Sequence, residues 1–280
     1  MSSQTEAAVS PSVKQSDKDK RVRLPFVRNK ALLGSVIPVL LIVIWELASR
    51  LGWVAPHLLP APTTVLGEVV SMAQSGELWG HVGITLYRVA AGFAFGAAAA
   101  VVLGAATGYS KIANYLLDPM LQALRAIPSL AWVPLFILWI GIGEASKITL
   151  VAVGVFFPVY LNLTSGIHGV DRKLIEVGRM YHFSTLQLIR RIILPAALPS
   201  FLVGIRSGLS LGWMFVVAAE LLGASQGLGY LMVFGQNTSA PELVVASILL
   251  FAIFGKLTDE LLKRLQQRAL RWQDSMENAS

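Results

Sequence analysis

The stretch VAAGFAFGAAAAVVLGAATG, from Val89 to Gly108, contains twenty residues and no charged side chain. A helix needs about 20 mainly apolar residues to cross the hydrocarbon core of a bilayer. Four other stretches approach the required composition, namely 31–48, 120–143, 148–167 and 196–223. A sixth candidate, Leu243–Gly255, is shorter, with only 13 residues between Glu242 and Lys256. The chain is therefore predicted to be an all-α integral membrane protein.

The overall composition agrees with a protein embedded in lipid. Of 280 residues, 55% are hydrophobic and 14% are charged, and the mean hydropathy is +0.64. Soluble domains carry about 25% charged residues, so this chain lacks the charge needed to cover a water-facing surface. The sequence contains no cysteine, which excludes disulfides, cysteine-based zinc sites, iron–sulfur ligation and thiol catalysis.

Positive charge is concentrated in alternate segments between the apolar stretches. Of the 23 Lys and Arg residues, 18 lie before the first stretch, after the sixth, or in the loops 109–119 and 168–195. With six crossings, all of these segments share one side, and the positive-inside rule makes that side the cytoplasm. The net charge of +7 then reflects topology and does not indicate nucleic acid. The other five cations are Arg50, Arg88, Arg125, Lys147 and Arg206.

These observations predict a domain organisation with both termini in the cytoplasm. Residues 1–30 form a disordered tail, 31–259 the membrane domain with a cytoplasmic loop at 168–195, and 260–280 a basic tail. Outside the membrane we expect a short amphipathic helix over Thr63–Ala73 and an uncharged, glycine-rich stretch over Ala224–Pro241. The predicted membrane helices span about 31–48, 86–108, 119–141, 147–167, 196–223 and 241–258.

Small residues recur at every fourth position in two of the membrane segments. One stripe runs through Gly92, Gly96, Ala100, Gly104 and Gly108, and the other through Gly204, Gly208 and Gly212. Such stripes allow helix backbones to approach closely in lipid. Two interpretations remain open, a static packing surface and an interface that slides during a functional cycle.

The third apolar segment is predicted to be kinked or broken, because it contains Pro119, Pro128 and Pro134 and proline disrupts a helix interior. Irregular backbone at membrane depth is tolerated where it is buried in protein or lines a wet cavity. The segment is either a pathway wall or a bent packing helix. The candidate pathway residues are Arg125, Pro128, Trp132, Asn162, Trp213 and Glu220.

Charged side chains inside apolar segments require a partner or water. Arg125, Arg206 and Glu220 fall in this class. The arginines would suit an anionic substrate, and structural pairing between arginine and glutamate explains them equally well. Glu46 and Arg88 lie near predicted segment ends, where we expect their side chains to reach the membrane interface.

The sequence contains no convincing motif for covalent chemistry. Gly208-Leu209-Ser210-Leu211-Gly212 matches the nucleophile pattern G-x-S-x-G, but that motif requires a strained turn after a strand, and here it falls inside a membrane segment. The sequence has no P-loop, no H-E-x-x-H and no haem motif. We therefore expect neither catalytic residues nor a metal or cofactor on this chain, and no energy source of its own.

The cytoplasmic loop His168–Pro195 has helical patterning of its own. One short amphipathic helix is expected from Val170 to Tyr181, and Ser184-x-x-Gln187 predicts a capping box that starts a second. Pro195 suits the first turn of the next membrane helix. This helical hairpin would be a docking element or, alternatively, an interfacial pair of helices lying on lipid.

The loop resembles a known family. Glu176-Val177-Gly178, His182 and Ile192-Ile193-Leu194-Pro195 resemble the E-A-A-x3-G-x9-I-x-L-P loop of permease subunits in binding-protein-dependent ABC importers. His182 replaces the glycine of that pattern, which suggests a positive φ at this position. By this resemblance the residues that couple to the ATPase are Glu176, Gly178, Arg179, Tyr181, His182, Phe183, Ser184, Ile192, Leu194 and Pro195.

Further motifs, over roughly residues 55–272, look like the nitrate, sulfonate, taurine and bicarbonate branch of that family. They are Leu59-Pro60-Ala61-Pro62, Leu124–Pro128, Trp139–Glu144 with Ser146-Lys147, Ala219–Gly223 and Gly227–Tyr230. The first expectation for the substrate is an aliphatic sulfonate. Nitrate, taurine, bicarbonate and vitamin precursors remain alternatives.

The resemblance implies a type I importer permease in a bacterial inner membrane. Its expected partners are a second copy of the chain, two cytoplasmic ATPase subunits that bind ATP and Mg, and a periplasmic solute-binding protein. Two other classes stay open from the residues alone. An ion-coupled transporter would need acidic side chains inside the membrane on a coupling route, and only Glu46 and Glu220 could serve. A membrane enzyme would need a cluster of His, Ser or carboxylate side chains.

Overall fold

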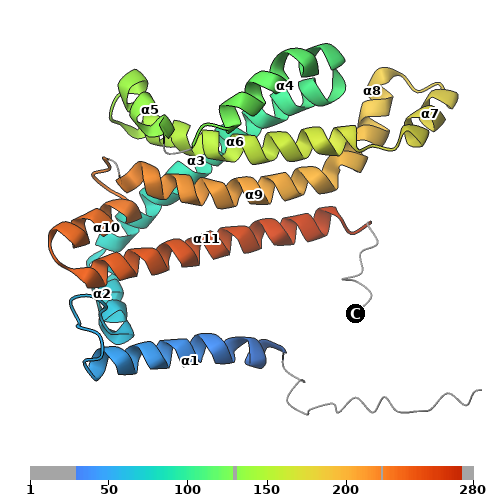
Figure 1. Ribbon diagram of the computed structural model, residues 1–280. Coiled ribbons are helices and arrows are strands. Elements are labelled where there is room, and N and C mark those ends of the chain that lie inside the picture. The colour runs from blue at the N-terminus through green and yellow to red at the C-terminus, as the bar shows by residue number, and fades with distance from the viewer. Residues whose placement is uncertain (1–29, 129–130, 222, 273–280) are drawn as a thin grey trace, which may run out of the picture.

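The computed structural model describes residues 30–128, 131–221 and 223–272, and all regular secondary structure within these ranges is helical (Figure 1). Residues 1–29 of the predicted tail 1–30, and residues 273–280 of the predicted tail 260–280, lie outside the described residues. The helices are α1 Lys30–Arg50, α2 Pro62–Ser75, α3 Glu77–Tyr109, α4 Lys111–Arg125, α5 Trp132–Ile140, α6 Glu144–His168, α7 Arg172–Met180, α8 Thr185–Leu188, α9 Leu194–Leu221, α10 Leu228–Asn237 and α11 Pro241–Ala269, with a π-helical turn η3 at Ile189–Ile193.

Four continuous helices are long and apolar enough to cross a membrane. They are Glu77–Tyr109, Glu144–His168, Thr185–Leu221 and Pro241–Ala269. The last of these contains Leu243–Gly255, the shortest of the six sequence candidates, so that candidate lies in a helix of sufficient length. The protein is thus an all-helical membrane protein with at least four candidate spans.

The centre of the molecule is α6, which makes its most extensive contacts with α3 on one side and α9 on the other. Val151, Val155 and Val159 of α6 are fully buried there. A Cβ atom added at Gly96 of α3 would lie 2.3 Å from the carbonyl oxygen of Ala152, and one at Gly204 of α9 would lie 2.7 Å from Cβ of Asn162. The two small-residue stripes are therefore close contact surfaces of a packed three-helix core, as the packing interpretation requires.

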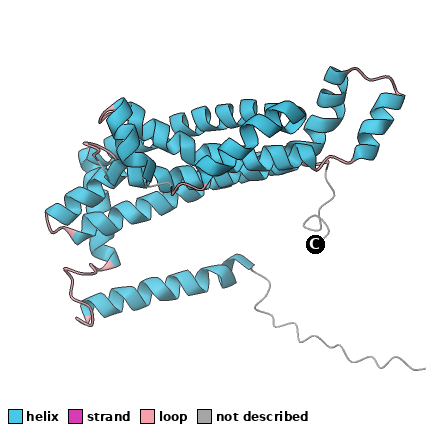
Figure 2. Ribbon diagram, turned by 45° about the horizontal axis from the view of Figure 1, so that its top comes forward, coloured by secondary structure: helices cyan, strands magenta, loops and turns pink. Residues whose placement is uncertain are grey.

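The N-terminal helix α1 stands apart from this core in both views (Figures 1 and 2). It is held to the turn before α2, where Trp45 Nε1 donates to the carbonyl oxygen of Pro60 at 3.0 Å. Glu46 pairs with Arg50 and accepts from the backbone N–H of Thr63 at 3.2 Å. Glu46 therefore stabilises the junction between α1 and α2.

The structure divides the third apolar segment into two helices. The segment was expected to be one kinked or broken crossing over about 119–141, and in the structure α4 ends at Arg125 and α5 begins at Trp132. Pro128 lies between them, where a proline prevents continuation of the helix. The kink or break expected from the prolines is thus confirmed as a break.

One stretch outside the core gains a helix, and one helix boundary differs from expectation. The glycine-rich stretch Ala224–Pro241, for which the sequence predicted no secondary structure, contains α10. Helix α11 continues to Ala269, well beyond the predicted end near residue 258, so the predicted basic tail begins inside a helix. The apolar pattern ends at Lys256, but the Leu, Lys, Arg and Gln residues that follow are good helix formers, and Glu260 and Arg264 form an i,i+4 pair at 3.2 Å.

Candidate functional site

The loop between α6 and α9, predicted to be cytoplasmic, folds into a helical hairpin that projects beyond the ends of these helices (Figures 1 and 2). Asp171 caps α7 by accepting from the backbone N–H of Lys173 at 2.9 Å. The predicted capping box is present at the start of α8. The backbone N–H of Ser184 donates to Gln187 Oε1 at 2.8 Å, and the N–H of Gln187 donates to Ser184 Oγ at 3.4 Å.

The turn between the two arms depends on one unusual backbone angle and one glycine. His182 has φ of +53°, so histidine adopts the left-handed conformation that the family pattern fills with glycine. A Cβ atom added at Gly178 would lie 2.6 Å from both Leu188 Cδ2 and Ile192 Cδ1. Because Gly178 has no side chain, α7 packs directly against α8 and η3, and the hairpin is one compact unit.

The tip of the hairpin exposes a group of apolar side chains. Tyr181 is 73% exposed and Met180 78% exposed. The ring of Tyr181 lies 6.2 Å from that of Phe183, and the Arg191 guanidinium lies 5.3 Å from the centroid of the Phe183 ring. Arg179 is exposed beside them. Met180 was not among the predicted residues, although its place at the turn was a signal that it would be exposed.

The Glu176 carboxylate has no partner within the hairpin. A glutamate at this place in a short helix could pair with basic residues or free amides of the neighbouring helix. Glu176 is exposed on α7, and its side chain forms no hydrogen bond or ion pair with any described residue. Its carboxylate is therefore not used to hold the two arms of the hairpin together.

A π-helical turn joins the hairpin to the membrane helix. In η3 the backbone N–H of Leu194 donates to the carbonyl oxygen of Ile189, five residues earlier. Pro195 follows, and in a regular α-helix its ring would clash with the carbonyl of Arg191. The wider turn accommodates that ring, so the helix is continuous from Thr185 to Leu221. The second arm of the hairpin and α9 are thus parts of one continuous helix.

The second group of candidate residues lies at the break between α4 and α5. Arg125, Pro128 and Trp132 line a pocket with an empty volume of about 680 Å³ that opens to the surface. The opposite wall comes from the middle of α6 and from α9. Its residues are Val153, Gly154, Phe157, Leu211 and Phe215.

The structure places the three other candidate pathway residues elsewhere. Asn162 lies in the contact between α6 and α9, where its Nδ2 donates to the carbonyl oxygen of Pro158 at 2.8 Å. Trp213 is only 8% exposed and donates from Nε1 to Thr258 Oγ1 at 2.9 Å. Glu220 is 1% exposed. Because all three are engaged between packed helices, they do not line the pocket beside Arg125.

Glu220 belongs to a buried ion cluster that the sequence did not reveal. We expected Arg88 at the membrane interface, but it is 1% exposed. Its Nη1 donates to Glu220 Oε1 at 2.8 Å, and its Nε and Nη2 donate to the carboxylate of Glu144 at 2.7 and 2.6 Å. Glu220 also accepts from Thr85 Oγ1 and from the N–H of Gly229, both at 2.8 Å. The cluster joins α3, α6, α9 and α10.

Arg206, the remaining cation of an apolar segment, is also paired. Its Nε and Nη2 donate to the two carboxylate oxygens of Asp259 on α11, each at 3.0 Å. This bidentate pair is structural. The expectation that Arg206 and Glu220 each have a partner is thus confirmed.

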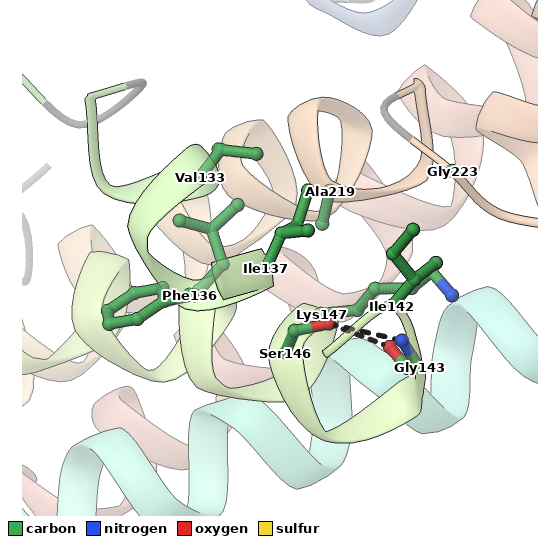
Figure 3. Close-up of a pocket in the computed structure, with 10 residues that line it drawn as sticks. Val133, Phe136, Ile137, Ile142, Gly143, Ser146, Lys147, Ala219 and Gly223 are labelled. Atoms are coloured by element: carbon green, nitrogen blue, oxygen red, sulfur yellow. Dashed lines mark hydrogen bonds between the residues drawn. The ribbon is translucent and has the colours of Figure 1, made fainter. Parts of the chain in front are cut away.

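A smaller pocket lies beneath α5 (Figure 3). Its wall is mainly apolar, from Val133, Phe136 and Ile137, and its main polar groups belong to the start of α6. There Ser146 Oγ donates to the carbonyl oxygen of Gly143 at 2.9 Å. These groups already satisfy one another, so the pocket is a gap in packing. Among the described residues, no group of three or more His, Asp and Glu is placed to hold a metal ion.

Comparison with known proteins gives consistent results. Residues 84–271 match the family described as "Binding-protein-dependent transport system inner membrane component". A Bacillus subtilis protein named putative aliphatic sulfonates transport permease protein SsuC is 46% identical over 87% of this chain and 88% of its own. The Escherichia coli protein of the same name is 41% identical over 84% of this chain and 90% of its own.

A solved structure shares the fold. A chain of the methionine ABC transporter MetNI, in an inward-facing conformation, aligns with a TM-score of 0.57 at 20% identity over 69% of this chain and 95% of that chain. With its family match and its long, apolar helices, this chain belongs to the inner-membrane permease subunits of binding-protein-dependent ABC importers.

Proposed function

We propose that the protein is the permease subunit of an ATP-driven importer of aliphatic sulfonates. The observation that carries this substrate is the identity of 46% and 41%, over most of each chain, to two proteins named as aliphatic sulfonate permeases. ATP hydrolysis belongs to a separate subunit. This chain contributes the translocation pathway and the coupling element.

The proposed assembly contains two copies of this chain, two cytoplasmic ATPases that carry ATP and Mg, and a periplasmic solute-binding protein. We place it in a bacterial inner membrane with six crossings per chain, namely the four long helices, α1, and α4 with α5 as one broken crossing. The cationic loops and the apolar α1 support this arrangement.

In the proposed cycle, ATP binding closes the ATPase dimer and pulls on the hairpin of α7 and α8. The pull passes through η3 into α9, because the helix is continuous. Helix α9 carries α6 with it, since Gly204 and Gly208 bring the two backbones into contact. The membrane part thereby turns from inward-open to outward-open and receives substrate from the binding protein.

Reporter fusions will test the proposed topology. Fusions after Lys30, Gln74, Arg179, Gln236 and Arg271 are expected to read in, out, in, out and in, because cationic segments stay in the cytoplasm. Enzymatic reporters active on only one side of the membrane give the measurement. An outside signal at Arg271 would show that α11 does not cross.

Growth tests will identify the substrate class. Deletion of the gene is expected to abolish growth on an alkanesulfonate as sole sulfur source, while growth on sulfate continues. Taurine, nitrate, bicarbonate and pyrimidine vitamin precursors serve as the comparison substrates. If only use of a vitamin precursor is impaired, the proposal of an oxyanion substrate is wrong.

Co-purification of an ATPase subunit in detergent separately tests the coupling partner, which an ion-driven transporter would lack.

A further inference from the structure

The cations outside the predicted cytoplasmic segments are almost all paired with carboxylates within the described chain. Of the five cations in this class, four have carboxylate partners in the structure: Arg50 with Glu46, Arg88 with Glu144 and Glu220, Lys147 with Glu144, and Arg206 with Asp259. The fifth, Arg125, is exposed and forms no ion pair or side-chain hydrogen bond with the described residues. This difference singles out one cation for a different role.

Counted along α6, the pocket of Arg125 lies near the middle of that candidate span. Its pocket is bounded by Val153, Gly154 and Phe157, and Gly154 is ten residues into α6. At a rise of 1.5 Å per residue this position is about 15 Å from the start of the helix, or about half the thickness of a hydrocarbon core of about 30 Å. A charged guanidinium at this depth is costly unless it faces water or an anion.

The surroundings of Arg125 fit a small organic anion. The cavity volume to compare with known ligand pockets is about 300 Å³, at the lower end of their range of about 300–1,000 Å³. Apart from Arg125 its lining is apolar, and Trp132, Phe157 and Phe215 supply three aromatic rings. A planar guanidinium can donate two parallel hydrogen bonds to an oxyanion, and the rings offer a surface for a short alkyl chain.

We propose that this pocket is a waypoint for the substrate, in which the sulfonate group rests on Arg125 and the alkyl chain lies against the aromatic wall. The proposal rests on the function proposed above and adds to it the position of the anion inside the membrane. One cation without a second positive partner gives weak retention, which suits a passage that must release its cargo.

Gly154 sets the shape of the apolar wall. A Cβ atom added there would lie 2.6 Å from Cγ and Cδ2 of Phe215, so the ring of Phe215 rests directly on the backbone of α6. An alanine at this position must displace the ring, which itself lines the pocket, and so change the shape of the apolar wall. Gly154→Ala is therefore expected to reduce transport of longer alkanesulfonates more than transport of methanesulfonate.

The experiment uses the complete complex in proteoliposomes, with the ATPase and the binding protein present. Arg125→Gln is expected to lower ethanesulfonate uptake by about tenfold or more, because one charged contact to the moving anion is lost, and Arg125→Lys to restore part of it. The matched control is Lys111→Gln. Lys111 is an exposed cation at the other end of α4 that forms no ion pair with the described residues, and its loss should leave uptake unchanged.

Two readouts separate transport from assembly. The Arg125→Gln complex should retain its ATPase, elute as the intact assembly and still hydrolyse ATP in response to the loaded binding protein. Uptake at the unaltered rate would overturn the proposal. So would dissociation of the Arg125→Gln complex into single permease chains, since Arg125 would then pair with a carboxylate of the second copy. Failure of the unaltered complex to carry any sulfonate would instead refute the proposed substrate.

Discussion

Replacing Arg88 with glutamine is expected to remove most of the folded protein from the membrane. The change leaves the carboxylate of Glu220, whose side chain is 0% exposed, without its charged partner. Breaking a buried ion pair in this way costs about 3–5 kcal/mol, a large part of a total stability of about 5–15 kcal/mol. The measurement is the amount of monodisperse protein in detergent and its melting temperature.

Two further variants make this test specific. Glu144→Gln should cost less than Arg88→Gln, because the Glu144 side chain is 46% exposed and water screens the loss. The double variant Arg88→Gln with Glu220→Gln should recover part of the stability, since neither charge is then buried alone. An Arg88→Gln protein that melts at the unaltered temperature would contradict the structural role of the cluster.

The cluster also explains why several sequence motifs lie where they do. Residues from three motifs that carried the family resemblance, Glu144 with Lys147, Glu220, and Gly227 with Gly229, meet around Arg88. A Cβ atom added at Gly227 would lie 2.6 Å from the Glu220 carboxylate, and its φ is +127°. The residues of these motifs are therefore needed for packing at one end of the three-helix core, where they hold the start of α10 in place.

Local features of the fold could be read from the sequence, because each depends on neighbouring residues. The capping box at Ser184 and the positive φ at His182 are local backbone requirements. The break at Pro128 follows from proline chemistry. Hydropathy alone did not give the helix ends, since α4 begins at Lys111, before the apolar stretch starts.

The ion cluster was missed because its members are far apart in the chain. Arg88 and Glu220 are separated by 132 positions, and nothing in either local sequence indicates the other. Arg88 was placed at a helix end because its apolar stretch begins at Val89, yet α3 begins at Glu77, three turns earlier. Only the packing of α3 against α6 and α9 brings the charges together, and that packing is a tertiary property.

Disruption of the hairpin tip is expected to stop transport without unfolding the protein. In the proposed docking, Tyr181 and Phe183 are the apolar anchors that insert into a groove on the ATPase. Tyr181 is the sharper target, because it is 73% exposed and its replacement leaves the packing at Gly178 intact. Phe183 is half-buried under Arg191, so a charged residue there would also disturb the hairpin itself.

Tyr181→Glu is expected to weaken retention of the ATPase by about 30-fold or more, since an apolar anchor at an interface contributes about 2 kcal/mol or more. Uptake should fall to background. Glu176→Lys should have the same effect by reversing an exposed charge on α7 that has no partner within the described chain. The measurements are co-purification of the ATPase and uptake into proteoliposomes, with insertion and dimerisation followed in parallel.

His182→Gly is the matched control at the same turn. The residue has φ of +53°, and glycine adopts this conformation without strain, so the variant should bind the ATPase and transport at the unaltered rate. Because the three changes lie within seven residues of one another, a general effect of altering the hairpin would affect all of them. If Tyr181→Glu and Glu176→Lys both transport normally with the ATPase bound, the hairpin tip is not the element that couples to the ATPase. The proposed route from the hairpin through η3 to α9 would then be wrong.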